Sequence, residues 1–248
     1  MDIGEIISEA IRYPISDMDN IKYPLIVFGL LAIPMLLMMI SGTLLENSPL
    51  TGIFGILLII GLIAFILIAP GYLFSVIQEG IERSGLIPAI EIGKNIINTI
   101  KLFVISFVYN IIPAIIIFIL FYIVVGTSSS PFDSGFAVGI LIVTIIGIIL
   151  GILFGVLLTV ATLRFAKTDS MSEALSFSEV FEEAKTIGIG KIIAFIIVMG
   201  VISAVISLVG SLISIIPIIG VCISILVIYT FIGLFESYAV GLLYSDVE

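Results

Sequence analysis

The stretch GILLIIGLIAFILIAP, from Gly55 to Pro70, decides the fold class. It holds no charged residue and lacks the period-2 alternation of a lipid-facing β-barrel strand. A helix satisfies its own backbone hydrogen bonds in a bilayer, so we expect a membrane-spanning helix here. Around it, 61% of the 248 residues are hydrophobic and 11% are charged, with a mean hydropathy of +1.42. Soluble domains are about half apolar and about a quarter charged, which indicates an integral membrane protein.

Six apolar runs are long enough to cross a hydrocarbon core of ~30 Å, which takes about 20 helical residues. They are Tyr23–Ser41, Ile53–Gln78, Leu102–Gly126, Phe136–Phe165, Lys191–Ile213 and Gly220–Tyr244. We therefore expect an all-α polytopic membrane bundle of six transmembrane helices, forming one integral membrane domain over residues 1–248.

The basic residues predict the orientation of the bundle. All nine lie at the same set of helix ends: Arg12, Lys22, Arg83, Lys94, Lys101, Arg164, Lys167, Lys185 and Lys191. The opposite loops, GTLLENSPLTG, GTSSSPFDSG and SIIPIIG, contain no Lys or Arg. Because the Lys/Arg bias sets topology and Asp/Glu contribute little, we expect a multi-pass protein of the cell membrane with both termini cytoplasmic.

The chain also reads as three parallel repeats, near residues 1–80, 86–170 and 171–248. IKYPLIVFGLLAIP (Ile21–Pro34) and IKLFVISFVYNIIP (Ile100–Pro113) place a lysine and a proline at the same offsets. Each unit would hold an amphipathic elbow, a rising helix, a turn and a returning helix. Two crossings per unit give all units one orientation. Chance resemblance among apolar sequences is the alternative.

The expected elbows are the amphipathic segments Asp2–Pro14, Pro88–Ile100 and Ser170–Gly188, the last centred on Ser176–Gly188. In the first, Asp2 and Glu5 have the spacing of a capping box. In the second, Pro88 suits a first helical position. The polar faces are acidic, whereas helices that bind anionic lipid by charge are rich in Lys and Arg. We therefore expect the elbows to pack against their own bundle.

Small residues mark a packing face on the fourth run, where Gly139, Gly147, Gly151 and Gly155 follow a spacing of four or eight. Such stripes let helix backbones approach closely. Packing within the chain is favoured over a pore lining, and a homo-oligomer seam is the other option.

Three residues are candidate polar sites at membrane depth: Glu236, Arg164 and Asn110. Ionisable groups there are expensive and often functional. One hypothesis pairs Glu236 with Arg164, and the alternative is a snorkelling Arg164 with Glu236 in a cytoplasmic crevice. Asn110 is expected to hydrogen-bond across helices, because polar side chains hold membrane helices together.

Catalytic chemistry finds little support in the sequence. The chain has no histidine, which removes the commonest general base and metal ligand. Its single cysteine, Cys222, cannot form a thiolate metal cage. We expect no enzyme activity, no catalytic residues, no metal and no cofactor. No basic surface is available for nucleic acid.

The segment from Ala69 to Ile115, APGYLFSVIQEGIERSGLIPAIEIGKNIINTIKLFVISFVYNIIPAI, resembles the diagnostic region of an archaeal multi-pass membrane protein family, domain of unknown function 4013. The resemblance rests on Gly71, Tyr72, Pro88, Tyr109 and Pro113, which match the family's pattern in place. Leu175 departs from it, because an aromatic residue often stands there. The resemblance implies an archaeal cell membrane and supplies neither catalytic residues nor a substrate.

Two functions remain after these exclusions. The first is a non-enzymatic membrane scaffold that docks a partner on its acidic face, with membrane lipids, a cytoplasmic protein or a second copy as partners. The alternative is a small-solute permease or channel component with a path near Glu236, Asn110 and Arg164. Transporters usually carry polar residues and broken helices near the midplane. Pro34 and Pro113 supply breaks, but the polar lining is thin.

The predicted topology places Ser130 and Glu182 on opposite sides of the membrane. In a Cys222→Ala background, we expect a membrane-impermeant maleimide to label Ser130→Cys in intact cells. Glu182→Cys should react only after the cells are opened. Labelling of both positions from one side would contradict the six-span topology.

Overall fold

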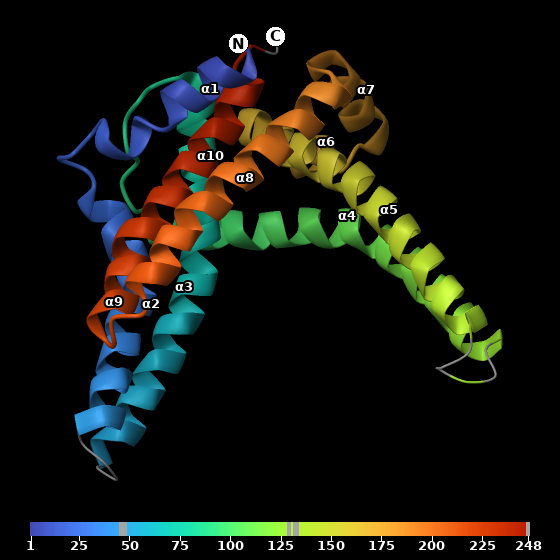
Figure 1. Cartoon of the computed structure of the whole chain (residues 1–248). Coiled ribbons are helices and arrows are strands. Elements are labelled where there is room, and N and C mark those ends of the chain that lie inside the picture. Colours follow the sequence, from blue (N-terminus) through green and yellow to red (C-terminus); the bar gives the residue numbers. More distant parts are fainter. Residues whose placement is uncertain (45–48, 128–129, 131–133, 247–248) are drawn as a thin grey trace. The chain divides into compact units, whose positions relative to one another are not determined.

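The computed structural model describes residues 1–44, 49–127, 130 and 134–246, and this part of the chain contains helices without strands (Figure 1). Six helical segments are long and apolar enough to cross a membrane. The elements are α1 (Ile3–Ala10), η1 (Tyr13–Ile15), α2 (Lys22–Leu44), α3 (Pro49–Glu82), α4 (Ile92–Thr127), α5 (Ser134–Thr168), α6 (Met171–Ala174), α7 (Phe177–Ile187), α8 (Ile189–Ile213), α9 (Ile219–Ile223), η2 (Ser224–Tyr229) and α10 (Thr230–Tyr244). The prediction of an all-α polytopic bundle is confirmed.

The chain divides into two compact units. The first unit comprises Met1–Leu102 and Ala194–Glu248, and the second unit comprises Phe103–Ile193. The boundaries fall inside α4 and α8, so they do not follow the predicted repeats. The single domain and the three repeats stay predictions, and parts of two predicted turns (45–48, 128–129 and 131–133) lie outside the described residues.

Helix α3 is the centre of the first unit, where α2 and α10 pack along it (Figure 1). Three of its glycines lie against the backbone of another helix, and Gly61 also meets the Pro34 side chain. A Cβ at Gly61 would lie closer than 3.0 Å to Leu30 O of α2. At Gly71 it would meet Asn95 O of α4. At Gly80 it would meet Tyr238 O of α10, and α10 returns the contact through Gly241.

The first and third elbows are separate helices that pack within their own units. Helix α1 begins with the predicted capping box between Asp2 and Glu5, and it packs on α10. Helices α6 and α7 pack on α5. Their apolar faces are buried by these neighbours.

The second elbow is not a separate helix, and the prediction of a helix start at Pro88 is wrong. The chain from Ser84 to Glu91 is non-helical, and Ile92 begins a continuous helix, α4. A hydrogen bond of 3.2 Å from the Tyr72 hydroxyl to Pro88 O binds this segment to α3. The bond accounts for a proline outside the helix, since Pro88 is held by its carbonyl.

The last span is not a uniform α-helix. It consists of α9, the π-helical turn η2 and α10. Ser224 in η2 donates a hydrogen bond of 2.7 Å to Gly210 O of α8, which binds the two arms of the hairpin. A π-helical turn holds an extra residue and shifts the register of the helix that follows.

In the second unit, the predicted glycine stripe on α5 divides into two halves. A Cβ at Gly139 would overlap the Val124 side chain, and one at Gly147 would stand 3.6 Å from Ile117. Both neighbours belong to α4. At Gly151 and Gly155, no atom of the described residues lies within 4 Å of such a Cβ. The described chain therefore supplies a close helix neighbour only at the first two positions.

We expect Gly80→Ala to destabilise the first unit, because a backbone carbonyl cannot rotate away from the added methyl group. Overpacking of this kind costs about 1–3 kcal/mol. Thermal unfolding in detergent, followed by circular dichroism, measures the effect. Gly151→Ala, with nothing within 4 Å, is the matched control and should be neutral or slightly stabilising, because alanine has the higher helix propensity. Equal stability of both variants would contradict a tight crossing of α3 and α10.

Candidate functional site

A polar cavity of about 630 Å³ lies beside α1 in the first unit. Its walls come from α1, the η1 segment, the end of α3 and the helix α10. The lining carries charges of both signs: Glu5 and Glu9 are negative, and Arg12 and Arg83 are positive. Such a lining offers hydrogen bonds and ion pairs to a small polar group.

Two stacked tyrosines form the floor of this cavity. The rings of Tyr13 and Tyr238 are 4.0 Å apart at their centroids and inclined by 7°. The Tyr13 hydroxyl donates a hydrogen bond of 2.7 Å to Leu86 O. Burial raises the pKa of Tyr13 well above its usual value, so the phenol is neutral and acts as a donor. The stack thereby fixes α1 and η1 to α10.

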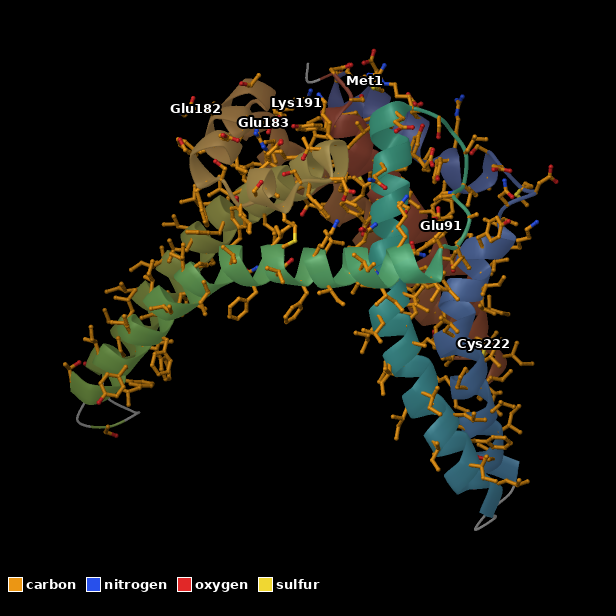
Figure 2. The ribbon with its side chains drawn as sticks, turned by 180° about the vertical axis from the view of Figure 1, so that it is seen from behind. Met1, Glu91, Glu182, Glu183, Lys191 and Cys222 are labelled. Atoms are coloured by element: carbon orange, nitrogen blue, oxygen red, sulfur yellow. The ribbon has the colours of Figure 1, made fainter. Side chains whose placement is uncertain are left out.

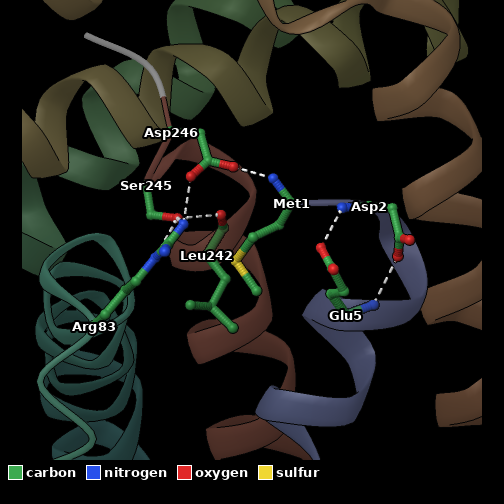
Figure 3. A network of polar contacts seen from close by, with 7 residues as sticks. All are labelled: Met1, Asp2, Glu5, Arg83, Leu242, Ser245 and Asp246. Carbon is green, nitrogen blue, oxygen red and sulfur yellow. Dashed lines mark hydrogen bonds and ion pairs between the residues drawn. The ribbon is translucent and has the colours of Figure 1, made fainter.

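A network at the rim joins the end of α3 to the end of α10 (Figure 3). The Arg83 guanidinium donates to Ser245 Oγ at 2.8 and 3.0 Å and pairs with the Asp246 carboxylate. The Met1 amino group contacts the same carboxylate. The amino group is the first cause that lowers the pKa of Asp246, and Arg83 adds to it. The network holds carboxylate and guanidinium charges together at the helix ends.

The backbone at Arg83 is in the left-handed region, with φ of 53°. Arg83 N–H donates to Gly80 O and Ser84 N–H donates to Glu79 O, the hydrogen bonds of a Schellman motif. Glycine is the usual residue at this position. An arginine there costs about 1 kcal/mol of backbone strain, and its side chain takes part in the network with Ser245 and Asp246.

In the second unit, Arg164 is neutralised by the third elbow. Its Nη1 donates to Glu183 Oε2 at 3.0 Å, and its Nη2 pairs with Glu179 and lies 3.7 Å from Glu173 Oε2. The Arg164 side chain is only 19% exposed. Glu182, beside Glu183 on α7 in Figure 2, is 68% exposed and pairs with Lys185 at 2.8 Å. Three carboxylates around one guanidinium leave this surface acidic.

Glu236 has a different kind of partner from the one expected. Its carboxylate accepts a hydrogen bond from the Ser203 hydroxyl, which joins α10 to α8 inside the first unit. Arg164 belongs to the second unit, where its partners are the elbow carboxylates. The hypothesis of a Glu236–Arg164 pair therefore gains no support and stays a prediction.

Asn110 and Tyr109 are neighbours on α4 with different surroundings. The Asn110 amide donates to Ser106 O of its own helix at 2.8 Å and is exposed. The prediction of a bond across helices is therefore wrong, because the local carbonyl one turn back takes the amide. Tyr109 is fully buried, and its hydroxyl donates to Ala174 O at 2.8 Å. Its ring lies 4.5 Å from that of Phe177.

The residues of the family pattern are structural in this chain. Gly71 N–H donates to Thr99 Oγ1 at 2.9 Å where α3 meets α4. Tyr72 and Pro88 close the connection between these helices. Tyr109 binds the third elbow to α4, and Pro113 lies inside α4.

Sequence reasoning missed the Tyr13–Tyr238 stack, Ser203 and the Arg83 network. Tyr13 had a signal, because it is an aromatic residue at the end of an amphipathic segment. Arg83 entered only as an orientation marker. Ser203 had only a packing signal, since it stands four residues before Ser207 and eight before Ser211, and such spacing does not identify the partner of its hydroxyl.

The cavity and the Arg164 cluster offer binding rather than an evident reaction centre. Among the described residues, no group of three His, Cys, Asp or Glu side chains can hold a metal ion. Cys222, labelled in Figure 2, is buried, and its thiol lies 3.7 Å from Ala32 O.

Comparison with known proteins gives a family and no function. The family described as "Protein of unknown function (DUF4013)" matches residues 53–215, more than half of the chain. No curated protein and no solved structure matches the chain.

We expect Tyr109→Phe to loosen the third elbow, because Ala174 O would lose its donor in a buried place. A buried unpaired acceptor costs about 1–3 kcal/mol. Limited proteolysis between α5 and α8, in detergent, should become faster. Tyr122→Phe is the matched control, since that phenol is 71% exposed. An unchanged cleavage rate would show that the elbow does not depend on this bond.

Proposed function

We propose that this chain, which belongs to the DUF4013 family, is a non-enzymatic membrane scaffold that docks a basic segment of a partner protein on the acidic surface of α7. Six helices that are long and apolar enough to cross a membrane support the membrane location. The cytoplasmic position of α7 and of both termini, and the archaeal source, are part of the proposal. So are the absence of enzyme activity and of nucleic acid binding.

The observation that carries the proposal is the way in which the elbows use their apolar faces. In α1, Ile6 and Ala10 are fully buried, and in α7, Val180 and Ala184 are fully buried. These faces pack on α10 and α5 of their own units. An interfacial helix that anchors in lipid needs its apolar face for the bilayer. Here the centre of that face is already occupied, so the remaining surface is mainly polar, with Phe181 as an exposed apolar side chain on α7.

The charge of that surface indicates the chemistry of the partner. Residues 169–187 hold five carboxylates against one lysine, and Glu179 and Glu182 are more than half exposed. Anionic lipid and nucleic acid are repelled by such a surface, whereas a Lys/Arg-rich protein segment is attracted to it.

The alternative, a small-solute permease, has one observation in its favour. Asn95 is 1% exposed, and in the described part of the chain its Nδ2 has no hydrogen-bond partner. A buried unpaired donor costs about 1–3 kcal/mol, which a passing polar solute or a water molecule would recover. Against it, the two cavities that α2 lines, one of about 700 Å³ between α2 and α3 and one of about 280 Å³ beside η1, have Lys22 and Thr230 as their only polar lining residues among those described. A solute path needs polar groups at depth.

The test is recovery of partner proteins from native membranes with a tagged chain. We expect Glu182→Lys to reduce recovery of the docked partner about tenfold, because an attraction becomes a repulsion at an exposed site. Asp19→Lys, an exposed carboxylate in the other unit, is the control and should leave recovery unchanged. Equal recovery with Glu182→Lys and the native chain would reject docking on α7. Solute flux in proteoliposomes that Asn95→Ala or Glu236→Gln abolishes would establish the permease instead.

A further inference from the structure

The polar cavity beside α1 is lined by one side of that helix. The apolar side of α1 carries Ile6 and Ala10, which are fully buried, and it packs on α10. Its polar side lines the cavity with four residues at the helical spacing i, i+3, i+4 and i+7: Glu5, Ser8, Glu9 and Arg12. The cavity therefore follows the polar side of α1 along its length.

Several polar groups of the cavity wall already have partners within the chain. Glu5 Oε2 accepts from a main-chain N–H at 2.9 Å, as part of the capping box. Ser16 Oγ donates to main-chain carbonyls, with distances of 2.8 and 2.9 Å. Arg83 and the Met1 amino group both bind the Asp246 carboxylate at the rim (Figure 3). These groups shape the wall and are engaged in holding it together.

Glu9 and Arg12 differ from these groups, because their charges are not neutralised within the described part of the chain. The backbone stays in the right-handed helical region through Ile11 and Arg12, so Arg12 keeps the register of α1. Glutamate and arginine three positions apart often pair on a helix. Here the exposed Arg12 side chain has neither an ion pair nor a hydrogen bond among the described residues. Glu9 Oε1 instead lies 3.5 Å from the Tyr238 hydroxyl.

A ligand that is complementary to Glu9 and Arg12 carries charges of both signs. Side chains one helical turn apart have Cβ atoms about 5–6 Å apart, so the two ligand charges should stand several bonds from each other. A short zwitterion meets this requirement, with an anionic group for Arg12 and an ammonium group for Glu9. A simple anion or cation would be attracted by one of the two residues and repelled by the other.

The size and the lining of the cavity favour a free molecule over a lipid headgroup. Its volume of about 630 Å³ lies within the range of ~300–1,000 Å³ that is usual for ligand sites. Met1 and the rings of Tyr13 and Tyr238 are the apolar side chains among the described residues that line it. The acyl chains of a lipid bound here would find little apolar wall beside its headgroup.

We propose that the cavity beside α1 binds a small free zwitterion of the amino-acid type, with its anionic group on Arg12 and its ammonium group on Glu9. The Ser8 hydroxyl, on the same side of α1, lines the site between Glu5 and Glu9. The site belongs to the first unit, and it goes beyond docking on α7 and does not depend on it.

The experiment is a titration of the full chain in detergent with 4-aminobutyrate, butyrate or butylamine, followed by saturation-transfer difference NMR. The three probes share a chain of the same length and differ in charge. We expect the dissociation constant of 4-aminobutyrate to be about fivefold lower than that of either singly charged probe, because one exposed ion pair contributes at most about this factor.

Charge variants separate the two ends of the ligand. Arg12→Gln should weaken binding of 4-aminobutyrate about fivefold and leave butylamine unchanged, since butylamine does not use the guanidinium. Glu9→Gln should weaken 4-aminobutyrate by the same factor, and butyrate should bind no more weakly than before. The double variant Glu9→Arg, Arg12→Glu should restore binding, because a zwitterion can bind in the reverse direction. Asp19→Asn and Lys94→Gln, exposed charges outside the cavity, are the matched controls.

A variant without a change of charge tests the cavity by shape. Ser8 is exposed and lines the cavity, so Ser8→Phe places a ring in it. We expect this variant to weaken 4-aminobutyrate at least fivefold. Ser178→Phe, at an exposed serine of α7, is its control. Circular dichroism shows whether each variant is folded, and the comparison of the three probes on the native chain needs no variant.

Three results would overturn the proposal. The first is binding of 4-aminobutyrate to the native chain that is no tighter than binding of butyrate or butylamine. The second is unchanged binding of 4-aminobutyrate in folded Arg12→Gln, Glu9→Gln and Ser8→Phe. The third is Arg12-dependent binding of phosphatidylethanolamine in nanodiscs without binding of 4-aminobutyrate, which would assign the cavity to a lipid headgroup.

Discussion

Three glycines of α3 hold the first unit together by letting three other helices approach the α3 backbone. Gly61, Gly71 and Gly80 each face a main-chain carbonyl, of α2, α4 and α10 respectively. In lipid there is no hydrophobic driving force between helices, because acyl chains are as apolar as leucine. Close backbone packing, with weak Cα–H···O contacts, is then the main source of attraction. The polar cavity, the Tyr13–Tyr238 stack and the Arg83 network all follow from α10 lying against α3 at Gly80.

The spans were predictable and these crossings were not. The length of an apolar run can be compared directly with the thickness of the bilayer. This comparison identifies a span without knowledge of the helices that pack against it. A glycine has no such independent signal. The stripe on α5 has regular spacing, yet Gly151 and Gly155 have no atom of the described residues near a Cβ. The glycines that do meet backbone on α3 are nine or ten residues apart, because each contacts a different helix. A spacing rule describes a long contact between two helices. It does not detect a helix that crosses three different helices at one glycine each.

For the candidate polar sites too, the sequence indicates the residue but does not identify its partner. Sequence reasoning singled out Arg164 and Glu236 as ionisable groups within predicted spans, since the cost of a charge in lipid does not depend on the fold. Their partners depend on the tertiary structure. Glu236 is bound by a serine hydroxyl and Arg164 by carboxylates of an elbow that follows it in the chain. Asn110 was assigned a partner across helices, and a carbonyl of its own helix was closer. Pro88 was assigned to a helix start, although its carbonyl is the acceptor that Tyr72 requires.

The docking proposal rests on a part of the chain that the family match covers. That match includes residues 53–215, and so α7 with its carboxylates and the Tyr109 contact that positions the elbow. The first unit depends on other contacts, because α2 packs on α3 at Gly61 and α10 packs on α3 at Gly80. A change at either glycine should disturb the first unit and leave the Arg164 cluster of the second unit intact, since the carboxylates of that cluster come from α6 and α7 and its guanidinium from α5.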